Sequence, residues 1–326
     1  MRRAGDVVPV ILVLRALGVG DLVTAVPALR ALRAAYPGRE VVLAAPAALA
    51  PLVDLVGGVD RLVDTSGLDG PARPGPAPGV AVNLHGRGPQ SHRLLAAAGP
   101  ARLLAFANAD AGFADGPRWV DDEHEVDRWC RLLSWYGIPA DRTDLALRRP
   151  APTGLPAGAT VLHPGSNVPA KRWPAERFAA LARALTDRGH RVLLTGSADE
   201  GALAARVADG AGLAPDAVLA GRTDLGALAG LVADARLVVS GDTGVAHLAT
   251  GYGTPSVVLF GPVPPARWGP PPDRPRHRVL WAGDRDWPRW DGVGSHPTLA
   301  AVHLDEVLAA VAEVERVVRV SGAVAA

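Results

Sequence analysis

The residues best suited to chemistry lie in one segment of the chain, residues 236–262. The run 237–239 is short and rich in β-branched residues, which predicts a strand buried on both faces of a parallel sheet. Glycines let residues 240–244 turn the chain, and residues 245–249 continue at helical spacing. A second buried strand is predicted over 256–260. The segment therefore predicts a strand, loop, helix and strand, the repeating unit of open α/β sheets.

The loop of this unit brings polar residues to a helix N-terminus. Asp242, Thr243 and Gly244 precede the helix, and His247 follows three residues later. The unpaired N–H groups and the positive dipole end of a helix favour an anionic ligand group. These four residues predict a site for a nucleoside diphosphate. A plain helix cap by Asp242 or Thr243 is the alternative that the spacing leaves open.

A second loop, rich in glycine and proline, holds the one lysine among 34 basic side chains. Lys171 lies near Ser166 and Asn167, after a strand predicted over 160–163 and before a helix that starts at Pro174. Its position in such a loop makes it a second candidate for contact with an anion.

Asp21 is the candidate catalytic residue of the N-terminal half. A strand is predicted over 9–15, followed by a glycine turn that ends in Gly20-Asp21 and a helix over 22–35. The dinucleotide-binding fingerprint fails because Val23 stands where its third glycine belongs, which argues against a nicotinamide dehydrogenase. A carboxylate at this helix start would repel a pyrophosphate. Asp21 therefore indicates either chemistry or helix capping.

The remaining pattern repeats strands and helices in both halves of the chain. Further strands are predicted over 40–45, 60–63, 80–84, 191–195 and 217–220, with helices over 46–56, 123–136, 224–233 and 298–318. The strand 80–84 ends in a polar segment, 85–92, where open α/β sheets place binding residues. A proline cluster over 147–156 predicts a linker, which gives domains 1–150 and 151–326.

The composition limits the class of protein. Hydrophobic residues at 48% and charged residues at 21% are typical of a globular chain, and 326 residues suffice for two domains. A net charge of +1 does not favour nucleic acid as a partner. The single cysteine, Cys130, cannot form an internal disulfide, so a reducing cytoplasm is expected.

The sequence predicts neither a transmembrane span nor a metal site. The apolar run 7–14 after Arg2-Arg3 resembles a signal peptide, but Arg15 interrupts it, and no segment predicts a transmembrane span. Peripheral association with a membrane stays open. Asp284-Arg285-Asp286 imitates a metal-binding pair, yet its irregular surroundings offer neither a strand nor a third ligand, so no metal site is predicted.

Together these motifs resemble glycosyltransferase family 9, the bacterial ADP-heptose:lipopolysaccharide heptosyltransferases. The resemblance rests on four stretches in the order of the family: Gly20-Asp21 with 26–29, 171–174, Asp242-Thr243-Gly244 with His247, and 253–262. It implies an α/β fold of GT-B type, in which two Rossmann-like, doubly wound domains face each other across a cleft. The N-terminal domain would hold the acceptor and the C-terminal domain the nucleotide sugar.

The family resemblance also implies the activity and the roles of the residues. It implies an inverting, metal-independent transfer of a heptose or related sugar, without a cofactor, from a nucleoside diphosphate, with ADP favoured, to a hydroxyl of a glycan or small metabolite. Asp21 would be the general base. Ser166, Asn167 and Lys171 would contact phosphate, Glu200 the ribose, and Asp242, Thr243, Gly244 and His247 the diphosphate and sugar. Gly20, His85, Arg87 and Gln90 are the acceptor-side candidates.

Two other classes of protein remain as alternatives. A non-catalytic nucleotide-sugar binder would keep the C-terminal motifs and would not need Asp21. A dehydrogenase would need the glycine that Val23 replaces. The donor base, the sugar, the acceptor and the oligomeric state stay open.

Overall fold

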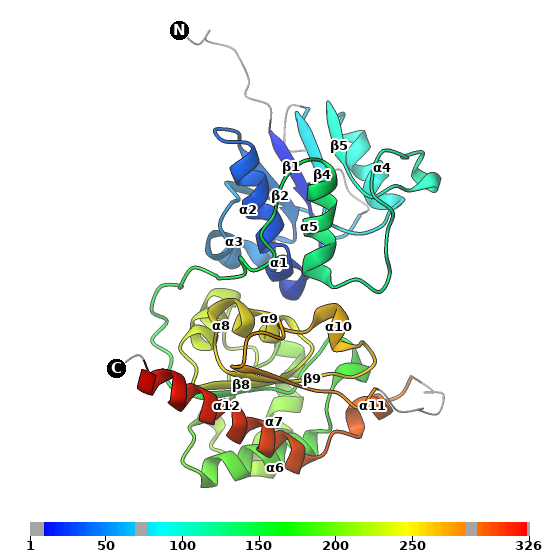
Figure 1. The fold of residues 1–326 in the computed structure, drawn as a ribbon. Helices are drawn as coiled ribbons and strands as arrows, with labels where there is room; N and C mark the ends of the chain where they lie inside the picture. Colours follow the sequence, from blue (N-terminus) through cyan, green and yellow to red (C-terminus); the bar gives the residue numbers. More distant parts are fainter. Residues whose placement is uncertain (1–9, 69–76, 284–291, 325–326) are drawn as a thin grey trace. The chain divides into compact units, whose positions relative to one another are not determined.

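The structure of the chain is a computed structural model that describes residues 10–68, 77–283 and 292–324. The chain divides between Arg148 and Arg149 into two compact units, unit 1 (Met1–Arg148) and unit 2 (Arg149–Ala326). Each unit contains one five-stranded sheet with parallel pairing throughout and helices packed on it (Figure 1). Two α/β units with parallel sheets agree with the predicted fold class.

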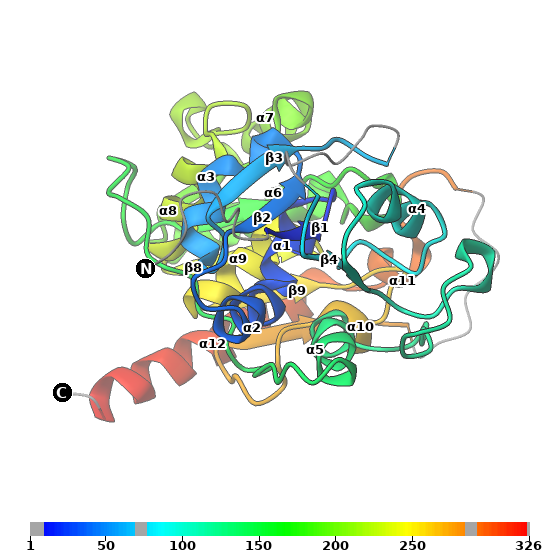
Figure 2. The same ribbon diagram turned by 90° about the horizontal axis from the view of Figure 1, so that it is seen from above.

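The sheet of unit 1 has the strand order β3-β2-β1-β4-β5, which can be followed from β3 to β4 in Figure 2. Its strands are β1 (Ile11–Leu14), β2 (Val41–Ala45), β3 (Arg61–Asp64), β4 (Val80–Asn83) and β5 (Arg102–Leu104). Every residue of β1, β2 and β4 is buried, because helices cover both faces of the sheet. The side chains of these three strands are accordingly almost all apolar.

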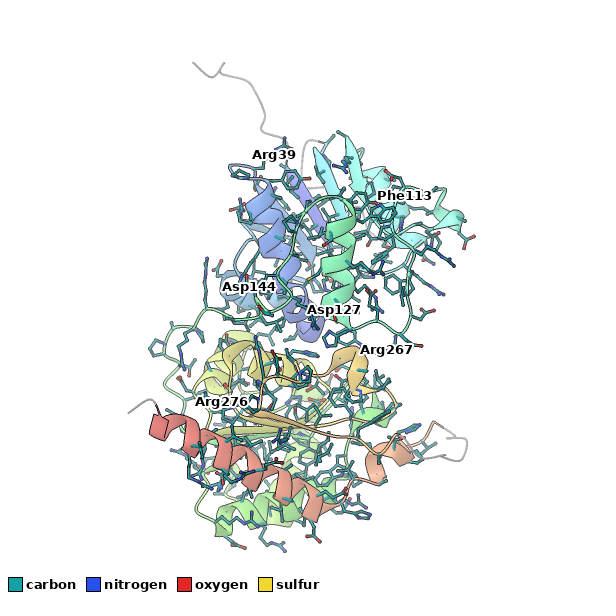
Figure 3. All side chains as sticks on the ribbon, in the orientation of Figure 1. Arg39, Phe113, Asp127, Asp144, Arg267 and Arg276 are labelled. Carbon is teal, nitrogen blue, oxygen red and sulfur yellow. The ribbon has the colours of Figure 1, made fainter. Side chains whose placement is uncertain are left out.

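Helices of unit 1 follow the strands in chain order. They are α1 (Val19–Thr24), α2 (Val26–Ala35), α3 (Ala50–Val56), α4 (Gln90–Ala97) and α5 (Glu125–Trp135), with the short 3₁₀ helices η1 (Ala47–Leu49) and η2 (Ala109–Ala111). α2 and α5 pack side by side (Figure 1). Asp144, labelled in Figure 3, pairs with Arg30 of α2 and so fixes the segment that leaves the unit.

The predicted helix over 22–35 is wrong as a single element, because the chain forms two helices that meet at Ala25. Pro27 explains the break: it has no N–H to donate to Val23 and its ring crowds that carbonyl. α4 and β5 were not predicted. Cys130 lies buried on α5, where burial and the charge of Asp127 raise the pKa of its thiol to about 12, as fits a packing residue.

The sheet of unit 2 has the order β10-β9-β8-β6-β7. Its strands are β6 (Thr160–His163), β7 (Val192–Leu194), β8 (Leu237–Gly241), β9 (Ser256–Leu259) and β10 (His277–Leu280). The segment 217–220, predicted as a strand, is not one: it contributes a single bridge between Val218 and Leu194. The edge strand β10 was not predicted.

Helices cover both faces of this second sheet. α6 (Ala175–Asp187), α7 (Gly201–Ala211) and α12 (Leu304–Val324) pack on one face, and α8 (Leu225–Ala233) and α9 (Gly244–Tyr252) on the other (Figure 1). The shorter elements are η3 (Pro169–Lys171), η4 (Ala198–Glu200), η5 (Pro215–Ala217), α10 (Pro265–Trp268) and α11 (Pro297–Ala300). The predicted helix 298–318 therefore divides into α11 and α12.

Each sheet has one place where the strand order reverses. In unit 1 the reversal lies between β1 and β4, and in unit 2 between β6 and β8. The carboxyl ends of the strands at such a reversal are where open α/β sheets bind ligands, because the connecting loops diverge there. The two candidate sites are therefore expected at these two edges.

Candidate functional site

In unit 2 the predicted donor residues gather at the reversal between β6 and β8. The two strands pair in parallel, with His163 opposite Ser240, so their loops leave the sheet side by side. The loop after β6 contains Ser166 and ends in η3, whose last residue is Lys171. The loop after β8 contains Asp242 and leads into α9. Residues that are distant in sequence thus meet at one edge of the sheet.

Lys171 and Asp242 form the central contact of this edge. The Nζ atom of Lys171 donates to Oδ2 of Asp242 over 2.7 Å, and the side chain of Asp242 is only 6% exposed. Nε2 of His247 lies 3.9 Å from the other carboxylate oxygen, and the His247 ring packs against the edge of Trp268 from α10. Asp242 therefore bonds to a cation and does not cap α9.

Thr243 and Gly244 begin α9. Thr243 is the N-cap residue of α9, as the capping alternative expects, but its side chain makes no capping hydrogen bond. Its Oγ1 atom is buried and has no partner within the described part of the chain. A buried hydroxyl without a partner costs free energy, which is typical of a position where a ligand supplies the missing contact.

The loop after β6 is held by its own hydrogen bonds. Ser166 is buried, and its hydroxyl accepts from the N–H of Val168 over 3.2 Å, while its carbonyl accepts from Arg172 over 2.8 Å. Asn167 is exposed at the tip. A β-carbon on Gly241 would lie 2.9 Å from the carbonyl of Lys171, so the two loops approach each other more closely than a side chain allows.

Glu200 lies buried beside the same loop. Its Oε2 atom accepts from the N–H of Ser197 over 2.8 Å, and its carboxyl group packs directly on Gly165. His163, at the end of β6, was not predicted as a site residue, although a polar residue that ends a buried strand is a recognisable signal. Its Nδ1 atom lies 3.0 Å from the Thr195 hydroxyl, and burial lowers its pKa against the opposing charge of Glu200.

In unit 1 the candidate base Asp21 lies at the reversal between β1 and β4. It is the third residue of α1, and its Oδ2 atom accepts from the N–H of Gly18 over 3.1 Å. Its Oδ1 atom lies 3.5 Å from the guanidinium of Arg15, and 27% of the side chain is exposed. Asp21 thus stabilises the helix start and also keeps part of its carboxylate accessible.

The acceptor-side candidates lie around the end of β4, apart from Gly20, which is in α1. The Nδ1 atom of His85 is buried with no hydrogen-bond partner among the described residues. Burial and then the charge of Arg15 lower the pKa of His85, while Asp21 opposes them, so the ring is neutral at pH 7. Arg87 and Gln90 are exposed.

The second half of the predicted polar segment serves the fold. α4 begins at Gln90, and Ser91 and His92 on its first turn are buried. The side-chain amide of Asn83 donates to Ser91 over 2.9 Å and lies 3.1 Å from Nδ1 of His92. These bonds hold the loop after β4 against the strand. Ser91 and His92 are therefore not positioned to meet a ligand.

Neither a metal cluster nor a membrane span is found in the described part. Residues 10–68, 77–283 and 292–324 contain no group of three or more His, Cys, Asp or Glu side chains that could hold a metal ion. No helix within those ranges combines the length and the apolar character that crossing a bilayer requires. Some of the sequence predictions fall outside the described residues: those on Arg2, Arg3, Asp284 and Asp286, and the strand start at Pro9.

Comparison with known sequences gives a consistent picture. A family model described as glycosyltransferase family 9 (heptosyltransferase) matches residues 118–286, just over half of the chain. Lipopolysaccharide heptosyltransferase 1 of Pseudomonas aeruginosa is 36% identical over 154 residues, which cover 45% of this chain and 42% of that protein. The Escherichia coli K12 protein of the same name is 30% identical over 155 residues, which cover 45% of this chain and 47% of that protein. The alignments therefore span less than half of these relatives.

Solved structures extend the likeness to nearly the whole chain. The glycosyl transferase family 9 structure from Veillonella parvula has a TM-score of 0.77 at 21% identity and covers 94% of this chain and 97% of that one. ADP-heptose LPS heptosyltransferase II of E. coli has a TM-score of 0.74 at 23% identity, with 94% and 98% covered. E. coli heptosyltransferase WaaC with ADP has a TM-score of 0.68 at 21% identity, with 93% and 99% covered. The fold is therefore of GT-B type, which confirms the predicted class.

Proposed function

The chain belongs to glycosyltransferase family 9, and from this premise we propose that it transfers a heptose or a related sugar from a nucleoside diphosphate to an acceptor hydroxyl. ADP is the proposed nucleotide, which is supported by the similar heptosyltransferase structure solved with ADP. The acceptor is a glycan or a small metabolite. Since a chain with one buried cysteine suits a reducing compartment, the proposed location is the cytoplasm.

The observation that carries this proposal is the Lys171–Asp242 pair beside the N-terminus of α9. An ammonium group has three N–H donors, and the contact with Asp242 uses one of them. The others, the first N–H groups of α9 and the Thr243 hydroxyl form a set of donors suited to a diphosphate. The Asp242 carboxylate would repel phosphate, so its proposed role is to hold Lys171 and to accept hydrogen bonds from the sugar.

The proposed reaction is a single displacement that inverts the anomeric carbon. As the acceptor oxygen bonds to that carbon, its proton passes to Asp21 and the bond from carbon to diphosphate oxygen breaks. A positioned carboxylate base typically contributes ~10²–10⁴-fold to such a step. Lys171 and the α9 N-terminus would stabilise the charge that grows on the leaving diphosphate, so that the reaction needs neither a metal nor a cofactor.

A nucleotide panel tests the donor class. ADP, UDP, GDP, dTDP and NAD are each added and the thermal unfolding of the protein is measured. A nucleotide present at a hundred times its dissociation constant should stabilise the folded protein by ~2.7 kcal/mol. We expect ADP to give the largest shift, and release of ADP from an ADP-sugar to follow in the presence of an acceptor. A shift with NAD alone would reject the proposed function.

Asp21→Asn tests the base. Asparagine is a comparable helix cap, so the variant should fold and bind ADP nearly as well as the wild type. Turnover should fall by at least ~100-fold, because an amide cannot accept the proton. Wild-type turnover in this variant, measured with the same acceptor, would show that Asp21 acts only as a cap.

Treatment with EDTA tests metal independence. We expect turnover in EDTA to equal turnover without it, because the charge on the diphosphate is met by Lys171 and the helix N-terminus. Turnover that disappears with EDTA and returns with magnesium or manganese would contradict this part of the proposal. It would direct attention to Asp284 and Asp286, which lie outside the described residues.

A further inference from the structure

Arg15 is a fully buried cation next to Asp21, the candidate base. It is the first residue after β1, and its side chain is 0% exposed. Its guanidinium donates to the backbone carbonyl of Asp21 over 2.5 Å and to the Thr24 hydroxyl over 3.2 Å. It also donates to the carbonyl of Leu84 and, over 3.0 Å, to the carboxylate of Glu125. Neighbouring groups enclose the whole Arg15 side chain, so any effect of Arg15 on the reaction passes through those neighbours.

These contacts join four elements at the reversal of the unit 1 sheet. Asp21 and Thr24 belong to α1, Leu84 follows β4 and precedes His85, and Glu125 is the first residue of α5. One guanidinium therefore fixes the positions of α1, the end of β4 and the start of α5 relative to the end of β1. The planar fork of arginine can serve several acceptors at once, which a lysine ammonium at the same place cannot reproduce.

The buried positive charge of Arg15 is compensated by the buried carboxylate of Glu125, which also pairs with Arg128. A guanidinium removed from water is tolerated when it is paired, and Glu125 is its buried partner. Burial alone would raise the pKa of Glu125, but the charge and hydrogen bond of Arg15, the charge of Arg128 and the hydrogen bond of Trp129 lower that pKa, so Glu125 is ionised. Trp129 donates to the same carboxylate over 2.9 Å and lies 4.8 Å beneath the guanidinium. Glu125 and Trp129 thus hold the Arg15 guanidinium in place.

The held guanidinium in turn determines the orientation of Asp21. Its Nη2 atom lies 3.5 Å from Oδ1, and the Gly18 N–H binds Oδ2, so both oxygens of the carboxylate have a fixed neighbour. The 2.5 Å bond to the Asp21 carbonyl fixes the backbone below. We propose that Arg15 is a positioning residue of the transfer reaction, which holds the Asp21 carboxylate in the orientation that accepts the acceptor proton. This inference rests on the proposed role of Asp21.

Arg15→Lys tests the inference, with Arg128→Lys as the matched control. Arg128 is also buried, also pairs with Glu125 and also stacks on a tryptophan, Trp119, but it does not contact α1 in the described part. Turnover, KM and the dissociation constant of ADP are measured for each variant. We expect Arg15→Lys to lower kcat by about 10- to 100-fold at unchanged ADP affinity, and Arg128→Lys to leave kcat near the wild type.

Repeating Arg15→Lys in the Asp21→Asn background separates positioning from general damage. If Arg15 acts through the carboxylate of Asp21, its substitution should lower the residual turnover of Asp21→Asn no further. An equal loss in both backgrounds, wild-type kcat in Arg15→Lys, or a matching loss in Arg128→Lys would each overturn the inference. Asp21→Asn alone tests the base: wild-type turnover there would remove the proposed role of Asp21 and this inference with it.

A second variant covers the case in which Arg15→Lys does not fold. Thr24→Val removes one acceptor of the Arg15 guanidinium and also the hydrogen bond that the Thr24 hydroxyl donates to the Asp21 carbonyl. The charge of Arg15 and the shape of the side chain at position 24 are kept. A partial loss of kcat, about 2- to 5-fold, is expected at unchanged ADP affinity, since two hydrogen bonds are lost and the other contacts of Arg15 remain. An unchanged kcat in folded Thr24→Val, where Arg15→Lys cannot be purified, would count against the inference.

Discussion

At the scale of single residues, Lys171 is the cation on which the proposed donor site depends. Its Nζ atom bonds to a carboxylate that is 6% exposed, while its own side chain is 24% exposed. It is thus held from below by Asp242 and still reaches the surface of unit 2. This geometry keeps a positive charge at one point beside the start of α9.

Lys171→Met should weaken ADP binding by roughly 1.5–3 kcal/mol, the range for a hydrogen bond to a charged group. Adenosine carries no phosphate, so its affinity should change little. Calorimetry with ADP and with adenosine measures both. Arg188→Met, which removes an equal charge from the exposed C-cap of α6, is the control and should bind ADP like the wild type. Equal ADP affinity in Lys171→Met would remove Lys171 from the site.

The sequence could identify several of these residues singly but could not show how they pair. Asp242 and Lys171 stood out because each lies in a glycine-rich loop between a strand and a helix. Their contact joins positions 71 residues apart, which no local pattern reveals. Arg15 was missed because an arginine at the end of a strand resembles an ordinary solvated charge. Only the structure shows that it is buried against Glu125, 110 residues away.

At the scale of elements, the close approach of the loop after β6 to η4 depends on Gly165. A β-carbon there would lie 2.2 Å from the Glu200 carboxyl carbon. Gly165→Ala should therefore displace the Glu200 carboxylate and break its bond to the Ser197 N–H, at a cost of ~0.5–2 kcal/mol in stability. If Glu200 contacts the ribose, adenosine and ADP should both bind more weakly, unlike in Lys171→Met. Denaturant unfolding and calorimetry measure the two effects.

Gly201→Ala is the matched control for that substitution. Gly201 begins α7, has φ −54°, and a β-carbon there would meet nothing within 4 Å. Alanine should stabilise the protein by ~0.4–1 kcal/mol and leave nucleotide binding unchanged, since it restricts only the unfolded chain. A Gly165→Ala protein with wild-type stability and wild-type adenosine affinity would contradict the role given to this contact.

Helices and strands with a strong local sequence pattern were predictable. Strands that form only because they pair with a neighbouring strand were not. The segment β8, α9 and β9 follows from its β-branched runs and its glycines. β5 and β10 are three- and four-residue edge strands that each contain arginine, and their pairing comes from the neighbouring strand. The apolar spacing of residues 22–35 suggested a single helix, which was wrong. Pro27 could have predicted the break between α1 and α2.

At the scale of the whole molecule, two α/β units were predictable because the strand and helix pattern restarts after a proline-rich linker. Each unit has its own buried sheet, and the core of unit 2 includes residues of β6, α6 and α12. The order of the strands could not be predicted, since buried strands in one parallel sheet look alike in sequence. That order creates the reversals at which both candidate sites lie.

Five buried or partly buried histidines should make the protein sensitive to acid. Burial lowers the pKa of His85, His92, His163, His190 and His277, the last to about 4 with the help of Arg274 and Arg276. Below pH ~6.5 the unfolded chain binds protons that the folded chain does not, so stability should fall with the pH. His277 alone accounts for roughly 2 kcal/mol by pH 5.

Urea unfolding at pH 7.5 and pH 5 measures this loss. His277→Gln should reduce the difference between the two pH values, because glutamine does not titrate. His303→Gln removes an exposed histidine and should leave the difference unchanged. A wild-type protein that is equally stable at both pH values would contradict the prediction.

The division of roles between the units predicts where ADP protects the backbone. The proposed diphosphate contacts come from the loops after β6 and β8, both in unit 2, so ADP alone should slow hydrogen exchange in residues 163–172 and 241–247. At a hundred times its dissociation constant, ADP should slow exchange there by up to ~100-fold, which corresponds to ~2.7 kcal/mol. Residues 18–24 of unit 1 should exchange as without ligand, and Lys171→Met at the same ADP concentration should lose the protection. Protection that first reaches α1 would place the nucleotide on the wrong unit and overturn the assignment of the donor site.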